Sequence, residues 1–306
     1  MIIREKHNWL RMLFVWRGSI LKDILPRLVV LFLFSLLVVF FREELSAYRV
    51  SFNPVPFTFI GIALAIFLGF RNNASYDRFW EARKLWGALL NTTRSLARQA
   101  ITMGGLPENS KQVTSFVHLL IAFTYALKHQ LRQTNATPDL ERLLPNPLAA
   151  AVGQHQYKPI RLLKELGFWV RQAKEEGRID AITQTAFDHN FNVLSDIVGG
   201  CERILGTPIP YPYSLLLHRT VYAYCYLLPF GLVQNSGWIT PLFVVLVGYA
   251  FMGLDVIINE IEEPFGLEPN DLALNNMSRM IESTLLEMIN MPAPTYPKNE
   301  NLYLVD

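Results

Sequence analysis

The sequence predicts an all-α membrane protein, and three observations support this prediction. Hydrophobic residues make up 51% of the 306 residues and charged residues only 18%, whereas soluble domains carry about 25% charged residues. The mean hydropathy is positive. Long apolar runs recur along the chain, and no stretch alternates between apolar and polar residues as a half-buried strand does.

Four segments are candidate membrane spans. Two are apolar runs of fourteen residues, Leu28 to Phe41 and Phe57 to Phe70, and two are longer, Tyr213 to Val233 and Ile239 to Ile258. Fourteen helical residues cover about 21 Å of a hydrocarbon core of roughly 30 Å. The short runs must therefore recruit flanking residues, thin the bilayer or line water, and we expect the first span over about 28–48. The alternative is that these segments are buried helices of a soluble protein. The fourth segment argues against this alternative, because it contains only one acid in twenty residues.

Loop charges predict the orientation of these spans. Basic residues precede the first apolar run and follow the second: Arg4, Lys6, Arg11, Arg17, Lys22 and Arg27, then Arg71, Arg78, Arg83 and Lys84. Because positive charges stay on the cytoplasmic side, both termini are expected in the cytoplasm of a multi-pass inner-membrane protein. The short loops Arg42 to Pro56 and Gln234 to Thr240 then face outward.

About 140 residues separate the second span from the third, which is too long for a loop. We expect cytosolic helices over about 71–205 and 259–290, continuous with the membrane helices in one unit, 1–306. Helical periodicity and breaks support this reading: helices at Val113–Gln133, Pro159–Glu176 and Ile179–Leu205, and breaks at Gly104–Pro107 and Pro138–Pro147. The first of these helices could be a fifth span, but Lys128, His129 and Arg132 favour a core helix.

Other function classes lack their usual signals. The chain has no phosphate-binding loop, zinc-protease, dinucleotide-binding or redox motif, so neither an enzyme nor a cofactor is expected. A net charge of +2 gives no basic field for nucleic acid. Cys201 and Cys225 have no metal-ligand spacing and are expected to be two buried free thiols.

The second apolar run carries a stripe of its own. Ile62, Ile66 and Phe70 are spaced four residues apart and therefore share one face of a helix. Around a central axis, several copies would form hydrophobic rings that gate a pore by dewetting. Packing against other helices or lipid is the alternative. Gly61 and Gly69 on the same helix would allow close helix approach.

The segment that follows this stripe resembles the signature of the bestrophin family. It reads RNNASYDRFWEAR from residue 71 to 83, and the positions we take as the signature are Arg71, Asn72, Asn73, Tyr76, Asp77, Arg78, Trp80 and Glu81. A second match is EPFG at 263–266, followed by Asn270, Asp271 and Leu272. The resemblance spans almost the whole chain and implies a homopentameric ion channel with one central pore, similar to bacterial members.

The resemblance also implies roles for individual residues. The family's narrow neck falls on Ile62, Ile66 and Phe70. A further cytosolic constriction falls near Ile179, with Ile182 as the second candidate. The family's calcium clasp would fall on four acids, Glu260, Glu263, Glu268 and Asp271, but most consecutive acids are missing here. Because calcium takes six to eight oxygen ligands, we regard this clasp as degenerate and calcium as doubtful.

The resemblance implies passive conduction, with membrane lipids and monovalent ions as partners. An uncharged neck does not fix the sign of the ion. We expect monovalent cations, sodium foremost, with chloride as the alternative; a secondary transporter or a membrane scaffold are the other readings. The last segment, Met291 to Asp306, contains three prolines, which favour an extended chain. An extended chain can be either an ordered strap or a loose tail, and both alternatives stay open.

Overall fold

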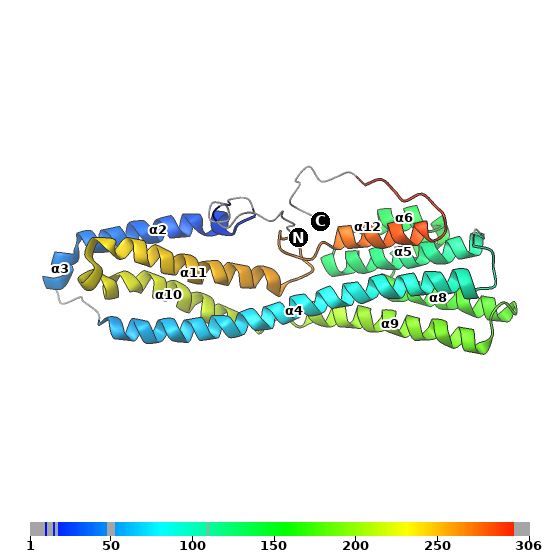
Figure 1. Ribbon diagram of the computed structural model, residues 1–306, viewed down its shortest axis with the longest axis horizontal. Coiled ribbons are helices and arrows are strands. Elements are labelled where there is room, and N and C mark those ends of the chain that lie inside the picture. Colours follow the sequence, from blue (N-terminus) through cyan, green and yellow to red (C-terminus); the bar gives the residue numbers. More distant parts are fainter. Residues whose placement is uncertain (1–9, 11–14, 16–17, 48–52, 109, 297–306) are drawn as a thin grey trace. The chain divides into compact units, whose positions relative to one another are not determined.

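The computed structural model describes residues 10, 15, 18–47, 53–108 and 110–296. Every regular element in these residues is a helix, which confirms the predicted all-α class (Figure 1). Of the C-terminal segment, residues 291–296 have no regular secondary structure, and 297–306 lie outside the described residues. The choice between a strap and a tail therefore stays open for that end.

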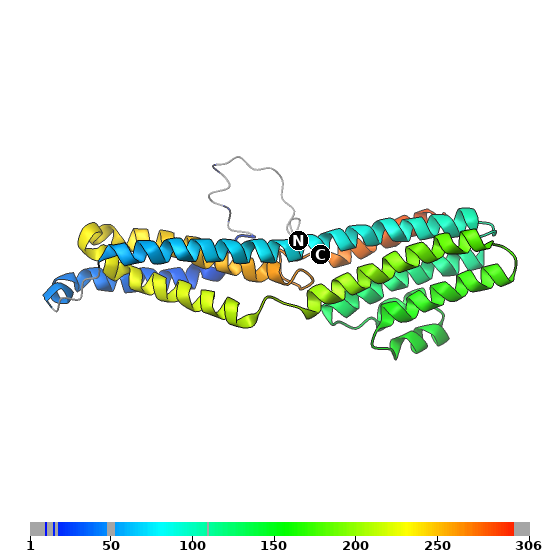
Figure 2. The same cartoon turned by 90° about the horizontal axis from the view of Figure 1, so that it is seen from below.

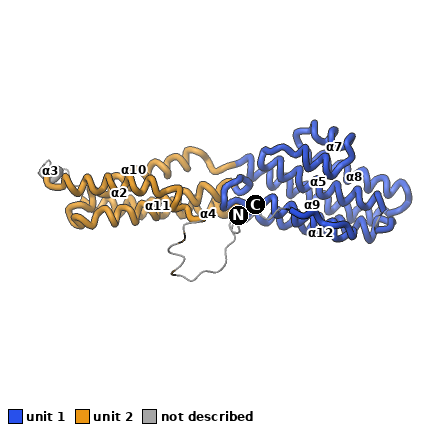
Figure 3. Tube along the Cα trace, turned by 90° about the horizontal axis from the view of Figure 1, so that it is seen from above, with its two compact units in different colours: residues 1–3, 80–207, 264–306 blue, residues 4–79, 208–263 orange. Residues whose placement is uncertain are grey.

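The chain divides into two compact units, which Figure 3 shows in two colours. Unit 2 contains residues 4–79 and 208–263, and unit 1 contains residues 1–3, 80–207 and 264–306. The helix α4 (Pro54–Met103) contributes residues to both units. We describe each unit by itself.

Unit 2 contains the apolar helices. Besides the first part of α4 it has α2 (Leu21–Phe40), α3 (Arg42–Ala47), α10 (Tyr211–Ser236), the short 3-10 helix η1 (Gly237–Ile239) and α11 (Thr240–Glu262). Three helical stretches in the described residues are long and apolar enough to cross a membrane: α2, α4 and residues 211–262. The third stretch consists of α10 and α11 together, which η1 separates.

The helix that contains the first apolar run does not coincide with the range of about 28–48 in which we expect the first span, and the span itself stays a prediction. The helix α2 begins earlier, at Leu21, and tolerates Pro26 within its second turn. It ends at Phe40, because Phe41 leaves helical geometry and closes the last turn by donating its N–H to the carbonyl of Leu37 at 3.1 Å. The flanking residues recruited for length therefore lie on the N-terminal side, and α3 is a separate helix.

The core of unit 2 joins α2, α4, α10 and α11. Its buried members are Ile24, Leu28, Leu31, Leu64, Leu68, Val221, Cys225, Leu228, Val244, Met252 and Ile258. A β-carbon at Gly248 of α11 would lie 2.6 Å from a methyl of Leu31, so this glycine allows α11 and α2 to approach closely. Both cysteines of the chain are buried and free, as predicted.

Unit 1 is a bundle of amphipathic helices, seen from a second side in Figure 2. It contains the end of α4 with α5 (Lys111–Arg132), α6 (Thr137–Leu143), α7 (Asn146–Gly153), α8 (Lys158–Glu175), α9 (Ala181–Gly206) and α12 (Leu274–Glu287). The ring of Phe116 lies 4.6 Å from that of Trp169 and 6.0 Å from that of Phe187. The helix α5 is buried over most of its length and is a core helix of this unit.

The predicted break at Pro138–Pro147 is wrong in detail. This stretch contains most of α6 and the start of α7, and each helix has its proline in the first turn. Proline is accepted there because the first N–H groups of a helix have no intrahelical partner. The break predicted at Gly104–Pro107 is confirmed, and Gly105 adopts a positive φ of 66° against the backbone of Arg178.

Candidate functional site

The part of α4 within unit 2 has two different faces. Leu64, Leu68 and Ser75 lie on one face and are at most 3% exposed. Ile62, Ile66 and Phe70 lie on the opposite face and are 54%, 52% and 62% exposed. The stripe predicted from sequence therefore has no partner within the described part of its own subunit.

Close packing of α10 fixes the buried face. A β-carbon at Gly61 would lie 2.8 Å from the hydroxyl oxygen of Tyr224, and one at Gly231 would lie 2.7 Å from the ring of Phe57. Small residues at these points let the two helices interlock. At Gly69 no atom comes within 4 Å of the position of a β-carbon, so only Gly61 makes the predicted close approach within the subunit.

A buried ion cluster anchors the same face at the end of the apolar run. The side chain of Arg71 is 1% exposed, and its Nη1 donates to Oδ1 of Asp255 at 3.0 Å. Its Nη2 donates to Oε2 of Glu262 at 3.0 Å and also to Oδ1 of Asn259. A buried charge is tolerated only when partners replace its lost hydration, and three acceptors on α11 do so here.

Asp255 has a second partner on α10. Its Oδ2 lies 2.7 Å from Nδ1 of His218, whose side chain is half exposed. One turn after Ser75, Arg78 donates its Nε to the carbonyl oxygen of Glu262 at 3.1 Å. These contacts join α4, α10 and α11 through polar groups over about two helical turns, in addition to the apolar core.

Sequence reasoning missed these partners, although a signal was present. Asp255 is the single acid of the fourth apolar segment, and the third contains no acid and only two basic residues, His218 and Arg219. An ionisable residue inside an apolar helix is a functional hypothesis by default, with a partner to be named. Asp255 therefore signals that a partner exists, although the spacing along its own helix does not say which residue it is.

The signature residues do not act as one cluster. In unit 2, Arg71 is buried, Asn72 is half-buried, and Asn73, Tyr76 and Asp77 are exposed. In unit 1, Glu81 forms an ion pair with Arg203 of α9, and Trp80 is half exposed. The two arginines, Arg71 and Arg78, thus face partners of their own subunit, whereas the side chain of Asp77 is exposed and has no ion-pair partner among the described residues.

The two candidates for a cytosolic constriction differ in burial. Ile179 lies in the turn before α9 and is 7% exposed, whereas Ile182 in the first turn of α9 is 80% exposed. A side chain that lines a pore must be accessible in the single subunit. Burial within the single subunit favours Ile182 over Ile179 for such a position, and both candidates and the constriction itself stay predictions.

The degenerate calcium clasp also stays a prediction. Among the described residues, no three His, Cys, Asp or Glu side chains converge in a way that could hold a metal. Asp271 is buried, and its Oδ2 accepts the backbone N–H of Glu268 at 2.7 Å. Glu263 and Glu268 are exposed, and Glu260 is half-buried.

A second buried ion cluster lies in unit 1 around Glu282. Its side chain is fully buried and accepts from Arg142 at 2.5 and 3.1 Å and from the hydroxyl of Tyr125 at 2.6 Å. Tyr296 also donates to it. Burial raises the pKa of Glu282, but the hydrogen bonds from Arg142, Tyr125 and Tyr296 outweigh it, so the pKa lies below its ordinary value.

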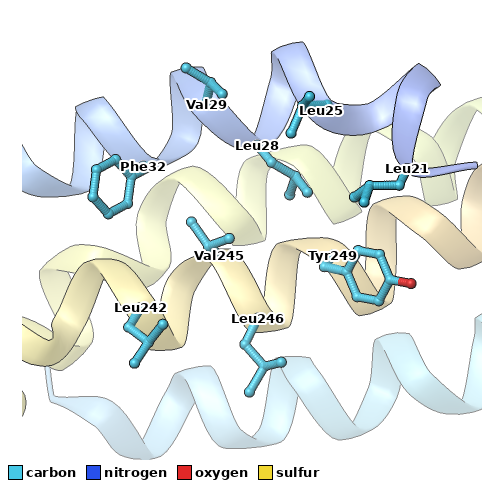
Figure 4. A pocket seen from close by; sticks show the side chains of 9 residues that line it. All are labelled: Leu21, Leu25, Leu28, Val29, Phe32, Leu242, Val245, Leu246 and Tyr249. Carbon is cyan, nitrogen blue, oxygen red and sulfur yellow. The ribbon is translucent and has the colours of Figure 1, made fainter. Parts of the chain in front are cut away.

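An apolar groove of about 430 Å³ lies between α2 and α11 (Figure 4). It is lined by Leu21, Leu25, Leu28, Val29, Phe32, Leu242, Val245, Leu246 and Tyr249. Only the hydroxyl of Tyr249 is polar among these side chains. The groove therefore suits hydrocarbon and offers no site for an ion.

Comparison with known proteins shows to which family the chain is similar. The profile described as Bacterial/Fungal Bestrophin protein matches residues 1–287. A voltage-dependent anion channel-forming protein of Ralstonia nicotianae is 50% identical over 293 residues, which cover 96% of each chain. A voltage-dependent anion channel-forming protein of Escherichia coli K12 is 42% identical over 288 residues, with 94% of each chain covered.

Solved structures agree with this assignment. The crystal structure of a bacterial bestrophin homologue from Klebsiella pneumoniae superimposes with a TM-score of 0.83 at 39% identity, covering 90% of this chain and 100% of that one. The apolar helices identify a membrane protein, and the matches span nearly its full length. The chain belongs to the bacterial and fungal bestrophin family, whose members are ion channels and not enzymes.

Proposed function

We propose that this protein is a homopentameric channel of the inner membrane that conducts ions passively through a pore lined by α4. The observation that carries the proposal is the two-faced α4. Its buried face is fixed by Arg71 and the core of unit 2, while Ile62, Ile66 and Phe70 are left exposed on the other face. Five copies around one axis would bring these three residues together as stacked rings.

The proposed membrane topology has four spans. At about 1.5 Å per residue, the 20 residues of α2, the 26 of α10 and the 23 of α11 each cover at least about 30 Å. The start of α4 supplies the fourth span. With η1 as the outward turn and both termini in the cytoplasm, the basic residues that precede Leu28 and those that follow Phe70 lie on the cytoplasmic side.

In this mechanism the neck is a hydration barrier. Ions lose part of their hydration shell as they pass Ile66 and its neighbours, because apolar rings offer no replacement ligands. No tight binding site is needed, which agrees with the lack of charged residues between Pro54 and Phe70. In unit 1, Ile182 is the candidate for a second constriction.

For the permeant ion we propose anions, chloride foremost. The relatives from Ralstonia and Escherichia are named as anion channel-forming proteins, which favours the chloride alternative over the sodium selectivity expected from the sequence. Phe70 fits this choice, since the edge of an aromatic ring carries a partial positive charge that attracts anions. The same relatives are named as voltage-dependent, and we propose this for the present protein too.

Reconstitution tests the proposal. Purified protein in a planar bilayer with asymmetric NaCl should give a reversal potential close to the equilibrium potential of chloride, and native mass spectrometry should give a pentamer. A reversal potential near that of sodium would overturn the anion assignment and leave the channel intact. A monomer or dimer without current would contradict the channel itself.

A further inference from the structure

The charges of α4 within unit 2 are divided by sign between its two faces. From Pro54 to Phe79 the helix has three charged residues, Arg71, Asp77 and Arg78. Arg71 is buried against Asp255 and Glu262, and Arg78 is half-buried and bonded to the backbone of Glu262. Both positive charges are therefore directed to partners in the subunit.

Asp77 lies on the exposed stripe. At about 100° per residue, Asn73 and Asp77 fall within the arc covered by Ile62, Ile66 and Phe70. Both side chains are exposed. Asp77 lies seven residues after Phe70, about 10 Å further along the axis. It is the one charged residue on this stripe in the described stretch 54–79.

We propose that Asp77 sets a negative potential at the cytosolic mouth of the pore and acts as a selectivity-determining residue. This inference rests on the proposed function, in which the stripe faces the pore axis. Five copies would then form a ring of five carboxylates below the ring of Phe70. A ring of carboxylates raises the local concentration of cations and lowers that of anions.

The sign of this effect opposes chloride conduction. The ring reduces the access of anions from the cytosol, so its removal shifts selectivity toward chloride whichever ion carries more of the wild-type current. Because the carboxylates lie in water and not in the dry neck, salt must screen them. The Debye length falls from about 10 Å at 0.1 M to about 3 Å at 1 M salt, so the effect must shrink at high salt.

Bilayer recordings of Asp77→Asn test the inference. The chloride-to-sodium permeability ratio should rise about two-fold or more at low salt and return toward the wild-type value in 1 M salt. Asp77→Glu should keep the wild-type ratio. Asp23→Asn is the matched control, because Asp23 is also an exposed acid, in the first turn of α2 and away from the stripe.

A second variant keeps the test independent of how well Asp77→Asn folds. Asn73→Asp adds a carboxylate on the same stripe, one turn closer to Phe70, and should shift the ratio toward sodium. Wild-type currents with unchanged ratios in both variants would overturn the role of Asp77 while leaving the channel proposal intact. Absence of wild-type current would overturn both proposals.

Discussion

Both units bury a charged side chain, but they surround it differently. In unit 2, Arg71 is enclosed by acceptors of α11, and the residue before it, Phe70, is 62% exposed. In unit 1, Glu282 is enclosed by donors, one of which, Arg142, is 41% exposed at its side chain. When the unit 1 cluster is broken, Arg142 can reach water, whereas breaking the unit 2 cluster at Arg71 leaves Asp255, whose side chain is only 1% exposed.

The largest effect is expected from Arg71→Met, which breaks the cluster of unit 2. Removing one partner of a buried ion pair leaves its carboxylates uncompensated and costs about 3–5 kcal/mol. We expect a loss of folded, assembled protein and faster amide exchange in α11, measured by size exclusion and hydrogen exchange. The double variant, Arg71→Met with Asp255→Asn, should recover part of the lost stability. Equal exchange in Arg71→Met and wild type would contradict the importance of this cluster.

A smaller effect is expected from Leu68→Ala on the buried face of α4. The cavity left by a fully buried leucine costs about 2 kcal/mol or more, even though lipid weakens the transfer term. The matched control is Ile66→Ala, whose side chain is 52% exposed and should change stability little. Thermal unfolding in detergent should separate the two variants, and equal losses would mean that the faces of α4 do not differ as described.

Glu282→Gln tests the cluster of unit 1. The amide keeps the size of the side chain but loses the charge that Arg142 faces, at a cost of about 1–3 kcal/mol. This should be less than for Arg71→Met because Arg142 can return to water. Hydrogen exchange in α12 reports the change locally. A larger loss of stability in Glu282→Gln than in Arg71→Met would reverse the comparison between the two units.

The same cluster predicts a dependence on pH. The pKa of Glu282 in the folded protein is lowered from 4.5. Its contribution to the stability of the folded protein is therefore fully present above about pH 4.5 and is lost as the pH falls through the lower folded pKa. Between pH 5 and pH 3 the melting temperature of wild type should therefore fall more steeply than that of Glu282→Gln. Parallel curves would mean that this carboxylate is not selectively stabilised in the folded protein.

Conductance measurements test the exposed face of α4. Ile66→Ala should increase single-channel conductance, because a smaller side chain widens the neck and lowers the dewetting barrier. Leu68→Ala, two residues away on the buried face, should leave the conductance of folded channels unchanged. Currents from Ile66→Ala that match wild type would count against the neck assignment.

The sequence predicts the helices well because apolar runs and periodicity are local signals. The boundaries of α2 and the two helices at Pro138 and Pro147 were missed, because proline in a first turn resembles a break. The ion partners of Arg71 were missed for a different reason. They lie on another helix, and spacing along one helix does not reveal which side chains meet across two helices. The same limit applies to Ile179 and Ile182, because the sequence gives no measure of their burial, and which of them forms a constriction stays a prediction.

The contact between Arg71 and Asp255 has a consequence for synthesis. The two residues are 184 positions apart, so at about 5–20 residues per second the arginine is made about 9–37 s before its acid partner. During that interval its long side chain can keep its charge at the water interface while its stem contacts lipid. The buried face of α4 at Arg71 is therefore completed only after the ribosome has made α11.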